Sequence, residues 1–265
     1  MAAQALLDSL LRQADYFVLL LFRVGGLVVS SPLFGRVGVP AQAKTGLVLS
    51  LTLLFFTLLP QPAPIVYSSL FGYGLILFRE VLIGIALAFV TNLFFSLTFV
   101  AGQLIDMQIG FGIVNVYDQQ NNTQIPMVGN LYNLTLLIVF FAAGGHRRLF
   151  AILYTTLQRL PVGSLSAAPQ IGLVALELFS KSFLLGVQVA LPIIASGLIL
   201  ELCFGVLIRT VPQMNMFVVG IPAKIVIGFV ILWACVPVFV HFGEQLFDQM
   251  FLGVEQMFAT FAGVP

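Results

Sequence analysis

The sequence predicts an all-α membrane-complex protein built from long, kinked helical hairpins rather than from a simple row of transmembrane spans. Of its 265 residues, 60% are hydrophobic and only 8% are charged, and the mean hydropathy is +1.10. Soluble domains carry about 25% charged residues, so this chain cannot supply a water-facing surface of its size. Its apolar runs are too long for strands and do not alternate with polar residues, so helices are the structure that satisfies the backbone in hydrocarbon.

Six apolar stretches follow one another along the chain, and each is expected to be helical. They lie at about 16–34, 47–59, 65–101, 127–143, 171–200 and 225–240. Ahead of them, within residues 1–15, leucines recur on one face of a short amphipathic helix. Segments rich in proline, glycine and polar residues separate the stretches: 35–44, 60–64, 102–126, 144–148, 161–169 and 201–224.

The lengths of these stretches do not fit six simple crossings of a membrane. A spanning helix needs about 20 apolar residues. The run 47–59 has 13 residues and 225–240 has 16, whereas 65–101 has 37 and no turn within it. The cations of alternate loops are also balanced, so the positive-inside rule gives no orientation. They are Arg36, Lys44, Arg209 and Lys224 on one side and Arg12, Arg147, Arg148 and Arg159 on the other.

Ionisable residues interrupt the apolar runs. They are Arg23, Arg79, Glu80, Glu177, Lys181 and Glu201. An unpaired charge at membrane depth costs several kcal/mol, so each is expected to have a partner or to face water. Glu177 precedes Lys181 by four residues, the favourable order for an ion pair on one helical face. Structural ion pairs are favoured here over a transport path.

No enzymatic signature is present in the sequence. The two histidines, His146 and His241, belong to no metal-ligand spacing, so neither a metal nor a cofactor is predicted. Asp106 and Asp118 have no spacing that would make them a catalytic pair, and a loop or helix-capping role is favoured. The net charge of +1 gives no indication of a nucleic-acid partner. The two cysteines are expected to be buried as small apolar residues.

Segment 107–126, MQIGFGIVNVYDQQNNTQIP, is the most unusual in the chain. Gly110 and Gly112 flank Phe111 and permit backbone conformations that a helix does not. Irregular backbone is tolerated in membrane proteins where protein covers it or where it lines a cavity. The polar half of the segment would suit an exposed loop, but Phe111, Ile113 and Val114 need a surface to pack against.

Segment 209–224, RTVPQMNMFVVGIPAK, is the second informative region. Pro212 and Pro222 bracket it and predict a turn between two helices. Lys224 opens the next apolar run, and a loop anchored by an interfacial lysine is the simplest interpretation. The polar residues of the segment that are candidates for assembly contacts are Arg209, Gln213, Asn215 and Lys224.

These motifs resemble the FliR/SctT family of type III secretion export gates. The matching elements are the F-R-E of residues 78–80 followed by Gly84, the G-F-G of residues 110–112, and the long R-x-x-P-Q-M-N-x-F…G-x-P-x-K run of residues 209–224. The resemblance covers essentially the whole chain. It also suggests that about 1–165 corresponds to a FliP-like part and about 171–265 to a FliQ-like hairpin.

The resemblance implies a non-catalytic subunit, present in one copy, that closes a ring of FliP and FliQ in the bacterial inner membrane. Such an assembly lies in the flagellar basal body, largely on its periplasmic side, with FlhA and FlhB as further partners, and exports unfolded flagellar proteins. The same resemblance implies that a loop at Gly110, Phe111, Gly112, Ile113 and Val114 plugs the central channel. Assembly or ion-pair roles then fall to Arg79, Glu80, Glu177, Lys181, Glu201, Arg209, Gln213, Asn215 and Lys224.

Two other classes compete with this interpretation. A secondary transporter or channel of unknown substrate would have internal repeats with equivalent broken helices, whereas the breaks near 110 and 212 have dissimilar flanks. An intramembrane enzyme would need a catalytic constellation, which the sequence lacks. Copurification separates the classes, because a gate subunit requires two other small membrane proteins and a transporter does not.

Overall fold

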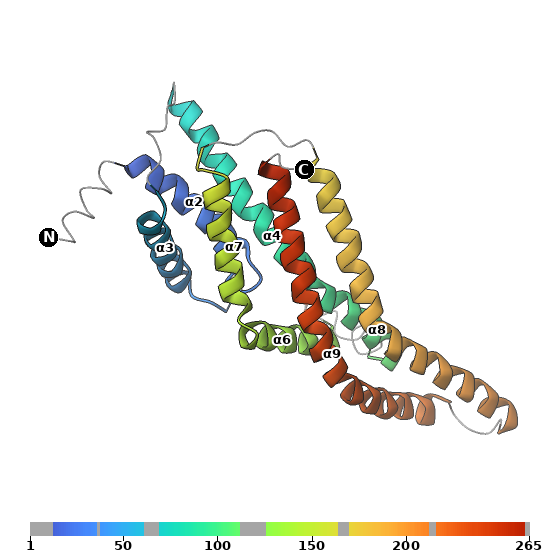
Figure 1. Ribbon diagram of the computed structural model, residues 1–265. Helices are drawn as coiled ribbons and strands as arrows, with labels where there is room; N and C mark the ends of the chain where they lie inside the picture. The colour runs from blue at the N-terminus through green and yellow to red at the C-terminus, as the bar shows by residue number, and fades with distance from the viewer. Residues whose placement is uncertain are drawn as a thin grey trace. The chain divides into compact units, whose positions relative to one another are not determined.

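The computed structural model describes residues 13–35, 38–60, 69–111, 126–163, 170–211 and 216–262. Its helices in chain order are α2 (Ala14–Ser30), α3 (Ala41–Leu58), α4 (Leu70–Ile109), α6 (Met127–Ala142), α7 (Gly145–Arg159), α8 (Ile171–Thr210) and α9 (Met216–Ala262) (Figure 1). The described residues contain no strand, which confirms the all-α prediction. Most of the amphipathic helix expected within residues 1–15 lies outside the described residues.

The chain forms two compact units, each assembled from separate stretches of sequence. Unit 1 comprises residues 1–92, 144–178 and 249–265, and unit 2 comprises residues 93–143 and 179–248. Helices α4, α8 and α9 each contribute to both units. The expected division near residue 165 concerned likeness to two other subunits, and it stays a prediction.

Three helices are far longer than a bilayer is thick. Helices α4 and α8 have 40 residues each and α9 has 47. At 1.5 Å per residue these are about 60 to 70 Å long, roughly twice the hydrocarbon core of a membrane. Four described helices are long and apolar enough to span a membrane: α3, α4, α8 and α9. A fifth span is possible if α6 and α7, broken at Gly144, are counted as one. The prediction that simple spans do not describe this chain is confirmed.

Several helices extend beyond the apolar runs that predicted them. The run 65–101 continues to Ile109, and the run 171–200 continues to Thr210. Helix α9 begins at Met216 and includes Pro222, so Pro222 lies inside a helix and not in the turn that the two prolines predicted. A proline removes one intrahelical hydrogen bond, and the apolar residues on both sides of Pro222 continue the helix across it. Polar helix formers such as glutamine and glutamate likewise extend helices without interrupting them.

Helix α7 was not among the predicted stretches, because its first turn contains the cluster His146-Arg147-Arg148. The periodicity was nevertheless present. Leu149, Ile152, Leu153 and Leu157 are buried on one face at spacings of three and four residues. Gly144 precedes the helix in the left-handed region at φ 72°. A search for apolar runs alone therefore does not detect an amphipathic helix such as α7.

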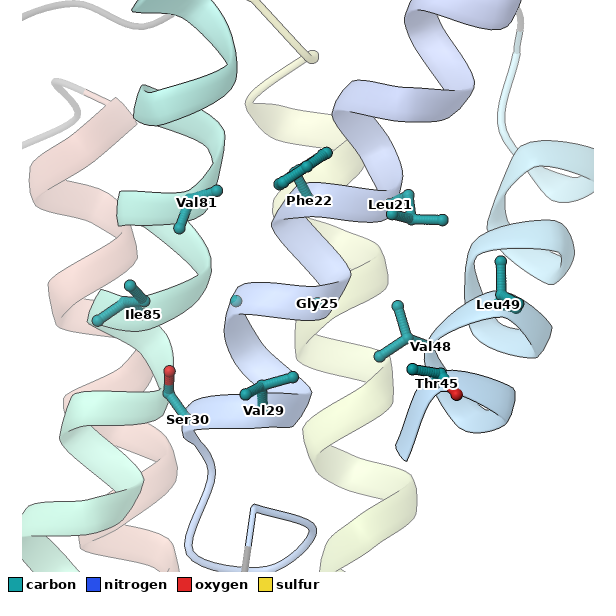
Figure 2. Close-up of a pocket in the computed structure, with 11 residues that line it drawn as sticks. Leu21, Phe22, Gly25, Val29, Ser30, Thr45, Val48, Leu49, Val81 and Ile85 are labelled. Atoms are coloured by element: carbon teal, nitrogen blue, oxygen red, sulfur yellow. The ribbon is translucent and has the colours of Figure 1, made fainter. Parts of the chain in front are cut away.

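The core of unit 1 includes α2, which lies between α3 and the first half of α4, together with α7 (Figure 1 and Figure 2). Tyr16 of α2 contacts Phe56 of α3 with ring centroids 5.9 Å apart, and Phe55 stacks on Tyr154 of α7 at 6.1 Å. The backbones of α2 and α4 also approach closely, since a Cβ added to Gly26 would lie 2.8 Å from the carbonyl oxygen of Val81. Small residues at the crossing therefore permit this tight packing.

Much of the apolar surface of α8 and α9 is not covered by the other residues that the structure describes. In the most apolar stretch of 18 residues of each helix, only 17% is buried. Leu202 is 71% exposed and Trp233 is 78% exposed. Both cysteines were expected to be buried, but Cys203 of α8 is exposed and Cys235 of α9 is only half-buried. The expectation failed because only part of each of these helices is covered by other described residues, and Cys203 lies on the part that is not.

Candidate functional site

The base of segment 107–126 is the first candidate site, and it lies wholly within unit 2. Helix α4 ends at Ile109, and Gly110 follows in the left-handed region at φ 101°. Its N–H donates to the carbonyl of Asp106 at 3.1 Å, which closes the last turn of the helix. A Cβ at Gly110 would meet nothing within 4 Å, so the backbone angle rather than lack of space calls for glycine here.

Asp106 joins the two ends of this segment. Its Oδ1 accepts a hydrogen bond from the N–H of Val128 at 3.2 Å, in the first turn of α6. A carboxylate at a helix N-terminus satisfies an amide that has no intrahelical partner and complements the helix dipole. Asp106 is only 1% exposed, so this cap is protected from water. Of the two roles expected of Asp106, a loop or a cap, the structure shows the cap, because Asp106 lies inside helix α4; Asp118 lies outside the described residues.

Helices α4 and α6 touch backbone to backbone next to the cap that Asp106 forms. A Cβ at Gly102 would collide with the backbone of Gly129. One helical turn further, Asn133 Nδ2 donates to the hydroxyl of Thr98 at 3.3 Å. Phe95 and Phe140 then meet edge to face at 5.7 Å. These contacts make the base of the segment a close-packed helical pair.

Helices α8 and α9 hold the other side of the base. The Gln108 side chain occupies the space that a Cβ at Gly197 of α8 would need. The Ile109 side chain packs against Gly228 of α9, where a Cβ would lie 2.8 Å from Cγ1. Phe111 meets Phe229 edge to face at 5.6 Å. The expectation that Phe111 packs against a surface is confirmed, and Gly112, Ile113 and Val114 lie outside the described residues.

A buried ion pair in unit 1 is the second candidate site. Arg23 Nε lies 2.5 Å from Glu80 Oε2, with the two side chains 0% and 1% exposed. Arg23 also donates to the carbonyl of Leu160 at 2.8 Å, and Glu80 accepts from the N–H of Gly163 at 2.8 Å. A buried pair is stable only when such hydrogen bonds complete it. This pair therefore connects α2, α4 and the end of α7.

The expectation that charges in the apolar runs find partners holds for Arg23 and Glu80. Arg23 was not chosen as a site residue, because its partner is 57 positions away and no local spacing connects them. Arg79, which precedes Glu80, is exposed instead. The nitrogen Nη2 of Arg23 has no hydrogen-bond partner within the described part of the chain.

The remaining candidates that the structure describes lie on α8 and α9. Glu201 pairs with Lys224 at 2.5 Å across the α8–α9 hairpin, with their side chains 51% and 19% exposed. Glu177 accepts a hydrogen bond from Gln256 at 3.4 Å. Lys181 and Arg209 are exposed. Gln213 and Asn215 lie outside the described residues. The assembly roles of all these residues stay predictions.

Neither candidate site has the groups that a metal centre needs. The described residues contain no cluster of three or more His, Cys, Asp or Glu side chains able to hold a metal ion. The ion pair connects three helices of unit 1, and the described base of segment 107–126 is a close-packed group of helices.

Comparison with known proteins gives the class of this chain. Residues 14–250 match the family described as bacterial export proteins, family 1. The flagellar biosynthetic protein FliR of Bacillus subtilis (strain 168) is 30% identical over 237 residues, covering 88% of this chain and 90% of that protein. FliR of Escherichia coli (strain K12) is 31% identical over 231 residues, covering 87% and 88%. FliR of Aquifex aeolicus (strain VF5) is 28% identical over 240 residues, covering 91% and 92%.

The fold and these matches define a helical membrane protein of the bacterial export class. The chain belongs to bacterial export proteins, family 1, the family of the flagellar FliR proteins. This membership supports a role in flagellar protein export within a membrane-embedded apparatus. The names of the relatives describe flagellar biosynthesis rather than an enzymatic reaction.

Proposed function

We propose that this chain is a non-catalytic subunit of the flagellar export gate, present in one copy, that closes a ring of FliP and FliQ subunits. FlhA and FlhB are its further partners, and unfolded flagellar polypeptides pass through the completed gate. The assembly belongs to the basal body at the inner membrane, with much of it on the periplasmic side. Residues 1–165 and 171–265 would then take the places of FliP-like and FliQ-like elements.

The observation that carries this proposal is the length of the uncovered apolar helices. Helices α8 and α9 are 40 and 47 residues long, about 60 and 70 Å, against a hydrocarbon core of about 30 Å. Roughly half of each apolar surface therefore lies beyond the hydrocarbon if these helices cross it. Exposed apolar patches of this extent mark protein interfaces. Partner subunits are the surfaces that would cover them.

We further propose that Gly110, Phe111, Gly112, Ile113 and Val114 form the plug of the channel. A plug needs a support that holds it in place and a backbone that bends freely above that support. The cap of Asp106 on α6 and the contact between Phe111 and Phe229 supply the support. The left-handed Gly110 supplies the bend. A plug of this kind seals by packing, so it requires no catalytic group.

The plug assignment is tested by deleting residues 110–114 and measuring ion leak through the purified, assembled gate in vesicles. The deletion is expected to raise the leak, because the apolar seal is lost. Asp106→Ala should raise it less, since losing a helix cap costs about 1 kcal/mol. Asp106→Asn keeps an acceptor for Val128 and should leave the leak near that of the unchanged protein.

The stoichiometry of the gate is tested separately by purifying the tagged chain from membranes. One copy of this chain should copurify with several copies of two other small membrane proteins. A leak that is unchanged after the deletion would overturn the plug while leaving the gate assignment intact. Recovery of the chain alone or as a small homo-oligomer would overturn the gate and favour the transporter class.

A further inference from the structure

The end of α4 is held on two sides that differ in kind, and both sides lie within unit 2. On the α6 side, the backbones of Gly102 and Gly129 touch. The buried N–H of Val128 also donates a hydrogen bond to Asp106. A buried hydrogen bond of this kind is costly to break when neither group finds another partner. The α6 side is therefore the firm side of the base.

On the other side, the hairpin of α8 and α9 lies beside the end of α4 (Figure 1). Three side chains, at the end of α4 and just after it, each pack on one residue of this hairpin. The three pairs, which we call the hairpin contact, are Gln108 on Gly197, Ile109 on Gly228 and Phe111 on Phe229. No hydrogen bond crosses this contact among the residues that the structure describes. The hairpin side is thus held by side-chain packing alone.

The Gln108 amide makes the hairpin contact easier to break. Its nitrogen Nε2 is buried and has no hydrogen-bond partner within the described ranges. A buried donor without an acceptor costs free energy, and this cost offsets part of the packing gained beside Gly197. Movement of α8 away from α4 would let water reach the amide and remove the cost. The contact is therefore opposed by a penalty that its release relieves.

The burial of the long helices also places the weaker attachment on the hairpin side. In the most apolar stretch of 18 residues, 61% of α4 is buried, against 17% of α8 and 17% of α9. Little of the apolar surface of α8 and α9 is thus covered by the rest of the described chain. Separating the hairpin from α4 would sacrifice few apolar contacts, whereas separating α6 would break a close-packed helical pair.

We infer that the hairpin contact is a releasable support, in which α8 and α9 hold the end of α4 in the closed gate and separate from it when the gate opens. The inference rests on the proposed function, since gate opening has a meaning only for an export subunit. It adds which side of the base moves: the hairpin separates, while α4 and α6 stay together.

A disulfide between positions 108 and 197 tests whether the contact must open. A Cβ at Gly197 would lie against Cγ of Gln108, so the Cβ atoms of two cysteines there would be within about 4 Å, the separation that a disulfide requires. Gln108→Cys and Gly197→Cys are combined in a chain that also carries Cys203→Ser and Cys235→Ser, which removes both native thiols. Copper phenanthroline is the oxidant, and mass spectrometry of the joined peptides measures the bridged fraction.

The disulfide is expected to form in the assembled complex and to stop export of flagellar proteins until dithiothreitol reduces it. The same variant kept reduced, and Gln108→Cys alone treated with the oxidant, are the controls and should continue to export. Export that continues through a bridged complex overturns the inference, because the contact then need not open. A disulfide that does not form in the assembled complex overturns the contact itself.

A second experiment exchanges size across the contact and needs no new bond. Gly197→Ala places a Cβ in the space of the Gln108 side chain and should raise ion leak through the purified gate in vesicles. Adding Gln108→Ala removes the collision and should lower the leak again. Gly205→Ala is the matched control on α8, because a Cβ there meets nothing within 4 Å. Equal leak from Gly197→Ala and Gly205→Ala, or no rescue by Gln108→Ala, contradicts the inference.

Failure of this inference can be told apart from failure of the proposed function. If deletion of residues 110–114 raises the leak but the bridged complex still exports, the plug stands and the releasable support falls. If the deletion leaves the leak unchanged, the plug assignment falls, and the disulfide still reports whether the hairpin separates from α4 during export.

Discussion

Helices α4 and α8 have the same length and similar hydropathy, yet very different fractions of them are buried. Each has 40 residues, and their most apolar windows have mean hydropathies of 2.1 and 2.3. In α4, 61% of that window is buried within the chain, whereas in α8 only 17% is buried. The first helix is therefore a structural core element, and the second presents its apolar surface outward. Hydropathy reports the need for burial but not which surface will satisfy it.

The buried ion pair is where α4 depends most strongly on its neighbours, so it should give the largest effect. Arg23→Met or Glu80→Leu alone leaves one buried charge without its partner and should destabilise the protein by about 3–5 kcal/mol. The double variant restores charge balance and should be more stable than either single variant. Thermal unfolding in detergent, arranged as a double-mutant cycle, measures the coupling. Strictly additive losses would show that the two residues act independently.

A second experiment compares the two long helices directly by adding one methyl group to each. Gly102→Ala in α4 forces a Cβ into the backbone of Gly129 and should cost about 1–3 kcal/mol. Gly205→Ala in α8 meets nothing within 4 Å and should stabilise its helix by up to about 1 kcal/mol. Unfolding midpoints of the two variants report the difference. Equal destabilisation would mean that α8 is as closely packed as α4.

The smallest effect on the chain itself is expected on the outer face of α9. Trp233 is 78% exposed, so Trp233→Ala should change the stability of the chain by less than about 0.5 kcal/mol. If partners cover this face, the same variant should lower the yield of the assembled complex, because buried tryptophans dominate interfaces. Quantitative copurification measures that yield. Phe94→Ala, at a fully buried position, is the contrasting control and should destabilise the chain itself.

Local patterns predicted those parts of the structure that depend on neighbours in sequence. The helical class and the break at Gly110 followed from short stretches of residues, and a cap was one of the two roles expected of Asp106. Helix α7 could also have been predicted from the sequence, because its leucines have helical spacing. The ion pair between Arg23 and Glu80 could not have been predicted in this way, because 57 positions separate the two residues and only the fold brings them together.

The base of segment 107–126 illustrates the same limit. Its glycines indicated an irregular backbone, and Phe111 indicated a packing surface. Nothing local identified Phe229 as that surface, or Gly197 and Gly228 as the positions that admit Gln108 and Ile109. Glycine is a weak signal by itself, because close approach and turn formation both favour it. The distinction depends on what lies opposite each glycine.

The sequence by itself determined that this chain is a helical membrane protein, because its scarcity of charge leaves no water-facing alternative. It also determined that simple spans could not describe the chain, since its apolar runs do not match the thickness of a bilayer. Only the tertiary structure decided which charges pair, which glycines are contacts, and which of two equally apolar helices is covered. The reason is physical. Hydropathy and helix propensity are properties of a residue and its neighbours in sequence, whereas burial is a property of residues brought together from distant parts of the chain.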